Sequence, residues 1–165
     1  REALTARVGL RSHRLSGMPY GNTFLYREQM ITGKGFTGRL SAFTQSIVLG
    51  LFAASVFMTP TRKLLQRFLP KPGEGPSPEA QAAGYFDISL IGKTGSGKRL
   101  EVQVTGDRDP GYGCTAKMLA QSGLSLAFDF DEVDREGGFW TPATLMGDKL
   151  ITRLIDHAGM TFNLK

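Results

Sequence analysis

The feature that most constrains this chain is an uncharged run of 22 residues, from Leu40 to Thr61. Residues 47–58 at its centre are apolar on every side of a helix, with Ser55 as the one polar residue. Such a helix has no polar face for water, so it is buried in protein or in lipid. Three environments stay open: a protein interior, a membrane surface and a complete membrane span of about 20 residues. The run begins too far along the chain for a signal peptide.

The formal charge of +5 conceals two parts of opposite sign. Residues 1–72 carry a net charge of +9, and residues 73–165 carry −4. A basic part indicates an anionic partner such as a nucleic acid, a membrane surface or an acidic ligand. The basic residues lack interleaved aromatic residues or a base-reading motif, so we expect no nucleic acid among the partners. The lone Cys114 fits a reducing compartment, and we expect a cytoplasmic protein, with association at a membrane left open as an alternative.

The first half of the chain is predicted to contain both strand and helix. Residues 1–39 are polar and basic, and short β-favouring runs such as residues 22–26 predict one or two strands there. The uncharged helix is followed by a second helix over residues 61–69, which Pro70 ends. We divide the chain into three segments: a basic segment with the apolar helix (1–69), a Pro/Gly-rich linker or loop (70–80) and an α+β segment (81–165). Together they are expected to form one composite domain.

Beyond the linker the hydrophobic period changes to two. Residues 85–91 and 100–105 alternate and are joined by a glycine-rich loop, which predicts a β-hairpin. Two amphipathic helices and a short strand follow: a helix at 113–128, a helix from Thr141-Pro142 to about His157 and a strand at 160–164. The predicted fold class is therefore α+β, with an antiparallel or mixed sheet packed by helices.

Three sequence patterns suggest a ligand site, but each lacks residues that such a site requires. The loop Gly92–Lys98 matches G-x4-G-K, but Arg99 follows in place of Ser or Thr, and a strand follows in place of a helix. The acidic residues 129–136 lack the glycine and the final glutamate of a calcium loop. His13 and His157 have no Cys or His partner at metal-ligand spacing, so we expect no metal site.

The turn at residues 107–117 has two interpretations. Glycines before a helix let an anionic or carbonyl ligand reach free backbone amides, and Arg108 and Tyr112 are placed to orient that ligand. The simpler interpretation is that Asp109 caps the helix and the glycines serve a tight turn. Cys114 lies on the same turn and is expected to be a buried apolar residue, although a helix N-terminus can lower the pKa of a thiol.

Four stretches of the chain together resemble one family. They are residues 69–77, 109–118, 137–143 and 146–154, and their order is similar to that of the C-terminal half of saccharopine dehydrogenase-like oxidoreductases. That group includes trans-acting enoyl reductases. The resemblance covers most of the chain from about Tyr20 onward. It also includes the apolar segment that leads into the Pro/Gly-rich stretch.

The resemblance implies an NAD(P)-dependent reductase whose cofactor lies on an N-terminal Rossmann domain. No glycine-rich dinucleotide fingerprint follows a strand here, so the resemblance implies that NAD(P)H binds outside this chain. The first residue is Arg1, and we expect the chain to be the later part of a longer protein, inactive alone. It would bind an acyl or lipid-like substrate and contribute to a homo-oligomer. The alternative is a non-catalytic interaction module that associates with a membrane or with lipids through the basic part and the apolar helix. The substrate-binding candidates are Arg108, Tyr112, Lys117 and, more weakly, Tyr26; no catalytic residue is predicted.

Overall fold

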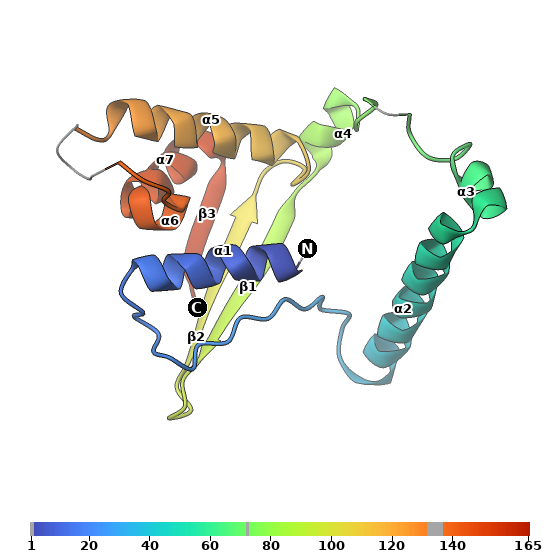
Figure 1. The fold of residues 1–165 in the computed structure, drawn as a ribbon, viewed down its shortest axis with the longest axis horizontal. Coiled ribbons are helices and arrows are strands. Elements are labelled where there is room, and N and C mark those ends of the chain that lie inside the picture. The colour runs from blue at the N-terminus through green and yellow to red at the C-terminus, as the bar shows by residue number, and fades with distance from the viewer. Residues whose placement is uncertain (1, 72, 132–136) are drawn as a thin grey trace. The chain divides into compact units, whose positions relative to one another are not determined.

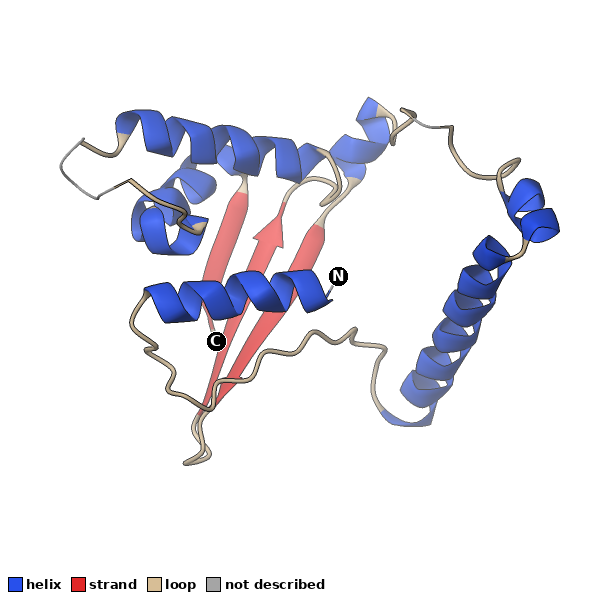
Figure 2. Cartoon of the chain, in the orientation of Figure 1, coloured by secondary structure: helices blue, strands red, loops and turns tan. Residues whose placement is uncertain are grey.

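The computed structural model of the chain describes residues 2–71, 73–131 and 137–165. It divides into two compact units, one formed by residues 1–26 with 76–165 and the other by residues 27–75. Helices α2 (Gly35–Phe57) and α3 (Thr59–Leu65) belong to the second unit, and every other described helix and strand belongs to the first. Figures 1 and 2 show the elements by label and by type.

A three-stranded antiparallel sheet lies at the centre of the first unit, with strands in the order β1-β2-β3. The strands are β1 (Phe86–Lys93), β2 (Arg99–Gly106) and β3 (Met160–Leu164). Together with the helices, this sheet confirms the predicted α+β class. The hairpin is confirmed with the register Phe86↔Gly106 to Lys93↔Arg99, and the predicted final strand is confirmed as β3.

The sheet has one apolar and one polar face, because its register places the even-numbered residues of all three strands on one side and the odd-numbered residues on the other. Val104 and Met160 are buried on the apolar face and join the core, while Thr105 and Thr161 form a hydrogen bond on the polar face. Gly106 is also buried on the apolar face, and a Cβ there would overlap the Phe86 ring. The glycine therefore lets the Phe86 ring lie across β2 and pack against the core.

Helices α5 (Gly113–Phe128) and α7 (Gly147–Ala158) pack against each other and supply most of the core. Cys114, Leu150, Leu154 and Ala158 are buried between these helices and the sheet. The predicted helix at 113–128 is confirmed with those bounds. The remaining helices of this unit are short or lie at the N-terminus: α1 (Glu2–Leu15), α4 (Pro78–Ala83) and α6 (Pro142–Leu145).

The predicted strands in residues 1–39 are wrong. Residues 2–15 form α1, and residues 22–26 have no strand partner in the described structure. Alanine, leucine and arginine favour a helix in the first stretch. In the second stretch the Phe24 ring packs at a tilt against the stacked rings of His13 and Tyr20, so its side chain is used in a local aromatic cluster and not on a sheet face.

The predicted helix from Thr141 to about His157 is interrupted. Thr141 begins α6 through a capping box with Thr144, as the Thr-Pro signal indicates. The chain then breaks at Met146, and α7 begins at Gly147, which has a positive φ of 48°. Glycine adopts this left-handed backbone readily, so the residue permits a change of direction that hydrophobic spacing does not reveal.

The second unit contains the uncharged run. Helix α2 begins at Gly35, five residues before the uncharged run, so it includes Arg39 in its first turns. It ends at Phe57, and α3 ends at Leu65, where turns replace the predicted helix up to Leu69. Among the described residues of α2 only Gly38 is buried. Residues 27–75 by themselves therefore provide no interior for α2.

Candidate functional site

The connection from β2 to α5 holds the candidates Arg108 and Tyr112, and the candidate Lys117 lies near the start of α5. Asp109 lies at the centre of this connection and accepts hydrogen bonds from three backbone N–H groups. The Gly111 N–H donates to Oδ1 at 2.9 Å, and the N–H groups of Tyr112 and Gly113 donate to Oδ2 at 3.0 and 2.8 Å. The Gly113 N–H lowers the pKa of Asp109 below its usual value, since it stabilises the carboxylate.

This arrangement confirms the simpler interpretation of the turn. The amides that open α5 already bind the carboxylate of Asp109, so a second anion would compete with a negative charge held in place. The backbone at this turn is thus a capped helix end. Any ligand bound here would have to contact the side chains around it.

Removing the Asp109 cap is expected to lower stability. Asp109→Ala leaves three N–H groups without their acceptor, and we expect the melting temperature to fall by about 4 °C, as for other N-caps. Differential scanning calorimetry measures this change. Asp156→Ala, at an exposed position in the last turns of α7, is the matched control and should change the melting temperature little. Equal shifts for both variants would contradict the role of Asp109.

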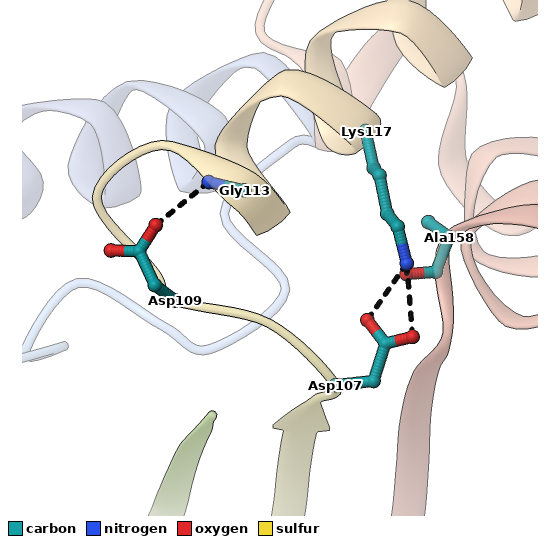
Figure 3. Close-up of polar contacts among 5 residues, drawn as sticks. All are labelled: Asp107, Asp109, Gly113, Lys117 and Ala158. Atoms are coloured by element: carbon teal, nitrogen blue, oxygen red, sulfur yellow. Dashed lines mark hydrogen bonds and ion pairs between the residues drawn. The ribbon is translucent and has the colours of Figure 1, made fainter. Parts of the chain in front are cut away.

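Lys117 links the connection between β2 and α5 to the end of α7. Its Nζ donates to both carboxylate oxygens of Asp107 at 2.9 Å and to the carbonyl oxygen of Ala158 at 3.3 Å (Figure 3). The ammonium group is therefore engaged by a carboxylate and a carbonyl from two other segments. Sequence reasoning placed Lys117 near the turn but did not pair it with Asp107, because no local spacing connects the two residues.

Arg108 and Tyr112 are the exposed candidates. Tyr112 is 56% exposed. Arg108 is also exposed, and its Cβ lies beside Gly113. Tyr26 lies elsewhere in the unit: its ring is close to Gly9 of α1, and the residue is half-buried. The structure brings Arg108, Tyr112 and Lys117 to one turn and places Tyr26 against another element.

Cys114 is buried, as predicted, and is not a reactive thiol. Its exposed fraction is 0%, and burial raises the pKa of the thiol, with a further contribution from the Asp107 carboxylate. The raised pKa keeps the sulfur protonated near neutral pH, and the buried thiol is out of reach of solutes. The helix N-terminus therefore does not activate this residue.

A second charged cluster joins the end of α5 to α7. Arg153 donates to both carboxylate oxygens of Asp129, through Nε and through Nη2 at 2.6 Å. Lys149 donates to the Asp129 carbonyl oxygen and lies 4.3 Å from the Phe130 ring centre. These contacts fasten two helices together. The predicted acidic loop continues into residues 132–136, which lie outside the described residues.

The Arg153 guanidinium lowers the pKa of Asp129 to about 2, from an ordinary value of 3.8. A lowered pKa means that the pair stabilises the fold above about pH 4, and that this contribution fades as the pH falls towards 2. We expect Arg153→Met to return the pKa of Asp129 towards 3.8, as measured by NMR titration of its carboxyl carbon. Arg99→Met, which removes the partner of Glu101, is the control. An unchanged Asp129 pKa in Arg153→Met would contradict this assignment.

The G-x4-G-K loop does not form a phosphate site. It is the tip of the hairpin, where the Thr94 N–H donates to the Lys98 carbonyl at 2.9 Å and the Lys98 N–H donates to Thr94 Oγ1 at 3.0 Å. Strand β2 follows it, so no helix N-terminus faces the loop. Within the described ranges no cluster of three His, Cys, Asp or Glu residues has the geometry to hold a metal ion.

Comparison with known proteins gives a consistent set of relatives. A putative trans-acting enoyl reductase of Mycobacterium tuberculosis is 36% identical over 152 residues, which is 90% of this chain. Trans-acting enoyl reductases of Mycobacterium bovis and Mycobacterium leprae are also 36% identical, over 154 and 151 residues. The chain is similar to trans-acting enoyl reductases. It spans 36% of the length of each of these relatives. No family model and no solved structure matches it.

Proposed function

We propose that this chain is the substrate-binding and oligomerisation part of an NAD(P)-dependent, saccharopine dehydrogenase-like reductase that acts on an acyl or lipid-like substrate. The observation that carries the proposal is the 36% identity to trans-acting enoyl reductases along 90% of the chain. An enoyl group is an unsaturated acyl group, so the name of these relatives indicates the substrate class. Because the chain spans 36% of their length, we assign cofactor binding and the reduction itself to other parts of a longer protein.

The described residues do not fit a dinucleotide. A Rossmann site needs parallel strands joined by a helix, with a glycine-rich turn that offers free amides to the pyrophosphate. Here the described sheet is antiparallel, and the amides at the start of α5 bind Asp109. We therefore place NAD(P)H on an N-terminal Rossmann domain outside this chain, and we derive no hydride-transfer step from the residues present.

Arg108 and Tyr112 are proposed to contact the polar end of the substrate. Both are exposed at one turn, and a guanidinium and a phenol are suitable donors for a carbonyl or anionic group. Lys117 supports this turn through Asp107 and Ala158, and Tyr26 remains a weaker candidate at another element. In this proposal Lys117 positions the turn, and Arg108 makes the contact.

The test is the affinity of the chain for an enoyl thioester, measured by isothermal titration calorimetry. Arg108→Gln and Tyr112→Phe each remove one proposed donor, and Arg108→Gln should weaken binding at least tenfold, since a hydrogen bond to a charged group contributes about 1.5 kcal/mol or more. Arg99→Gln, at the other end of β2, is the control and should leave the affinity unchanged. Equal affinity for Arg108→Gln and the unsubstituted chain would contradict the assignment.

The proposed homo-oligomer uses the uncovered half of the apolar sheet face. Ile88, Leu90, Leu100 and Leu164 lie on that face and are 47–70% exposed. Clustered exposed apolar residues of this kind are typical of interaction sites. Light scattering should therefore show a dimer that Leu90→Lys converts to a monomer, while Glu101→Lys on the polar face leaves it intact. A monomer at every concentration would contradict this part of the proposal.

A further inference from the structure

Helix α2 has the length and composition of a membrane-binding helix. Within the described part of the chain it is the one helix long and apolar enough to cross a membrane. Its 23 residues extend about 34 Å, and its large side chains are exposed, including Phe43 at 63%, Leu49 at 68% and Phe57 at 89%. Exposing so much apolar surface to water is unfavourable. A surrounding apolar medium would remove the cost.

The polar side chains of α2 are already satisfied within the helix. The hydroxyls of Thr44, Ser46 and Ser55 donate to the carbonyl oxygens four residues earlier, at 3.1, 2.8 and 2.6 Å. Gln45 Nε2 donates to Ser41 Oγ at 3.4 Å. Polar groups with internal partners cost less to transfer into lipid than unpaired ones. The uncharged polar residues of α2 are therefore compatible with a bilayer.

Positive charges lie on both sides of this apolar stretch. Lys34 and Arg39 precede it, Arg62 and Lys63 follow it, and residues 27–75 carry a net charge of +5. Lysine and arginine at the ends of an apolar helix reach the headgroup region and favour anionic lipids. The charge pattern is thus complementary to an anionic phospholipid surface.

The fold of the first unit excludes a single crossing. Residues before and after α2 pack together there: Ser12 Oγ and Thr141 Oγ1 are 2.8 Å apart, and Arg11 donates to the Phe139 carbonyl at 2.6 Å. A helix that crossed once would leave these residues on opposite sides of the membrane. The segment after α2, residues 58–75, holds four Lys or Arg residues and three prolines, and it is unsuitable as a returning span.

We propose that α2 binds in the plane of an anionic phospholipid bilayer, inserted into one leaflet. Thr37, Ser41, Thr44 and Gln45 make the first part of α2 the more polar part, whereas residues 47–57 are apolar on every side apart from Ser55. The polar part lies nearer the headgroups, and the apolar part inserts among the acyl chains. This binding surface is independent of the proposed substrate-binding role.

The test is flotation of the full chain with vesicles of phosphatidylcholine alone or mixed with phosphatidylglycerol. We expect binding to the mixed vesicles, reduced by salt, and about fivefold weaker for each charge removed in Arg62→Gln and Lys63→Gln. Leu51→Lys in the apolar part should weaken binding at least tenfold, whereas the matched variant Gln45→Lys in the polar part should keep it. Both positions are exposed, so circular dichroism should show an unchanged fold.

Three results would overturn the proposal. The first is no binding to either vesicle. The second is equal loss of binding in Leu51→Lys and Gln45→Lys, which would show that the apolar part has no particular contact with lipid. The third is a self-association that Leu51→Lys abolishes in the absence of vesicle binding, which would assign α2 to a contact between copies of the chain.

Discussion

Gly159→Ala is expected to lower the free energy of unfolding by about 2–3 kcal/mol. Gly159 ends α7 with a φ of 69°, a left-handed conformation that costs about 1–2 kcal/mol for a residue with a Cβ. The added methyl group would also overlap the Asp107 carboxylate, which holds Lys117. Displacing that carboxylate weakens its ion pair with Lys117, a contribution of up to about 1 kcal/mol.

Gly147→Ala separates the two effects. Gly147 also has a positive φ, at 48°, but a Cβ there meets no atom within 4 Å. It should therefore show the conformational cost alone, about 1–2 kcal/mol. Urea unfolding of both variants, compared at an unchanged dependence on denaturant, measures the difference. If Gly159→Ala is no more destabilising than Gly147→Ala, Asp107 does not lie against Gly159.

Leu154→Ala is expected to cost about 3 kcal/mol of stability. Leu154 is 8% exposed and belongs to the core formed by α5, α7 and the sheet, so the truncation removes apolar contacts and leaves a cavity. Ile155→Ala is the matched control, because Ile155 is the next residue on α7 and is 46% exposed. It should cost less than about 1 kcal/mol, measured in the same urea titration. Equal losses would place the core elsewhere.

Local signals predicted most of the fold after residue 80. Alternation over the hairpin and the capping residues Asp109 and Thr141 depend on neighbouring residues, and the structure has the hairpin and the helix starts at or near the predicted bounds. The N-terminal helix was not predicted, because the contacts that hold it, with Phe139 and Thr141, are distant in sequence. The break at Gly147 depends on a backbone conformation that the hydrophobic pattern does not contain.

In the candidate site, too, only features made by neighbouring residues were predicted from the sequence. The turn around Asp109 was predicted because its Asp, Pro and Gly residues are adjacent. The engagement of Lys117 by Asp107 and Ala158 depends on packing between α7 and α5, which no spacing in the sequence reveals. The family resemblance indicated enoyl reductases, and the relatives support that part. The saccharopine dehydrogenase-like scheme and the separate cofactor domain remain proposals.

The division of roles between acyl binding here and cofactor binding elsewhere is tested most directly by titrating the chain with NADPH and with an enoyl thioester. Calorimetry should show binding of the thioester and no heat of binding for NADPH, because the amides at the start of α5 already bind Asp109 and the described sheet is antiparallel. Stoichiometric binding of NADPH with a dissociation constant of about 10 μM or below, a range typical of a functional ligand, would contradict the account.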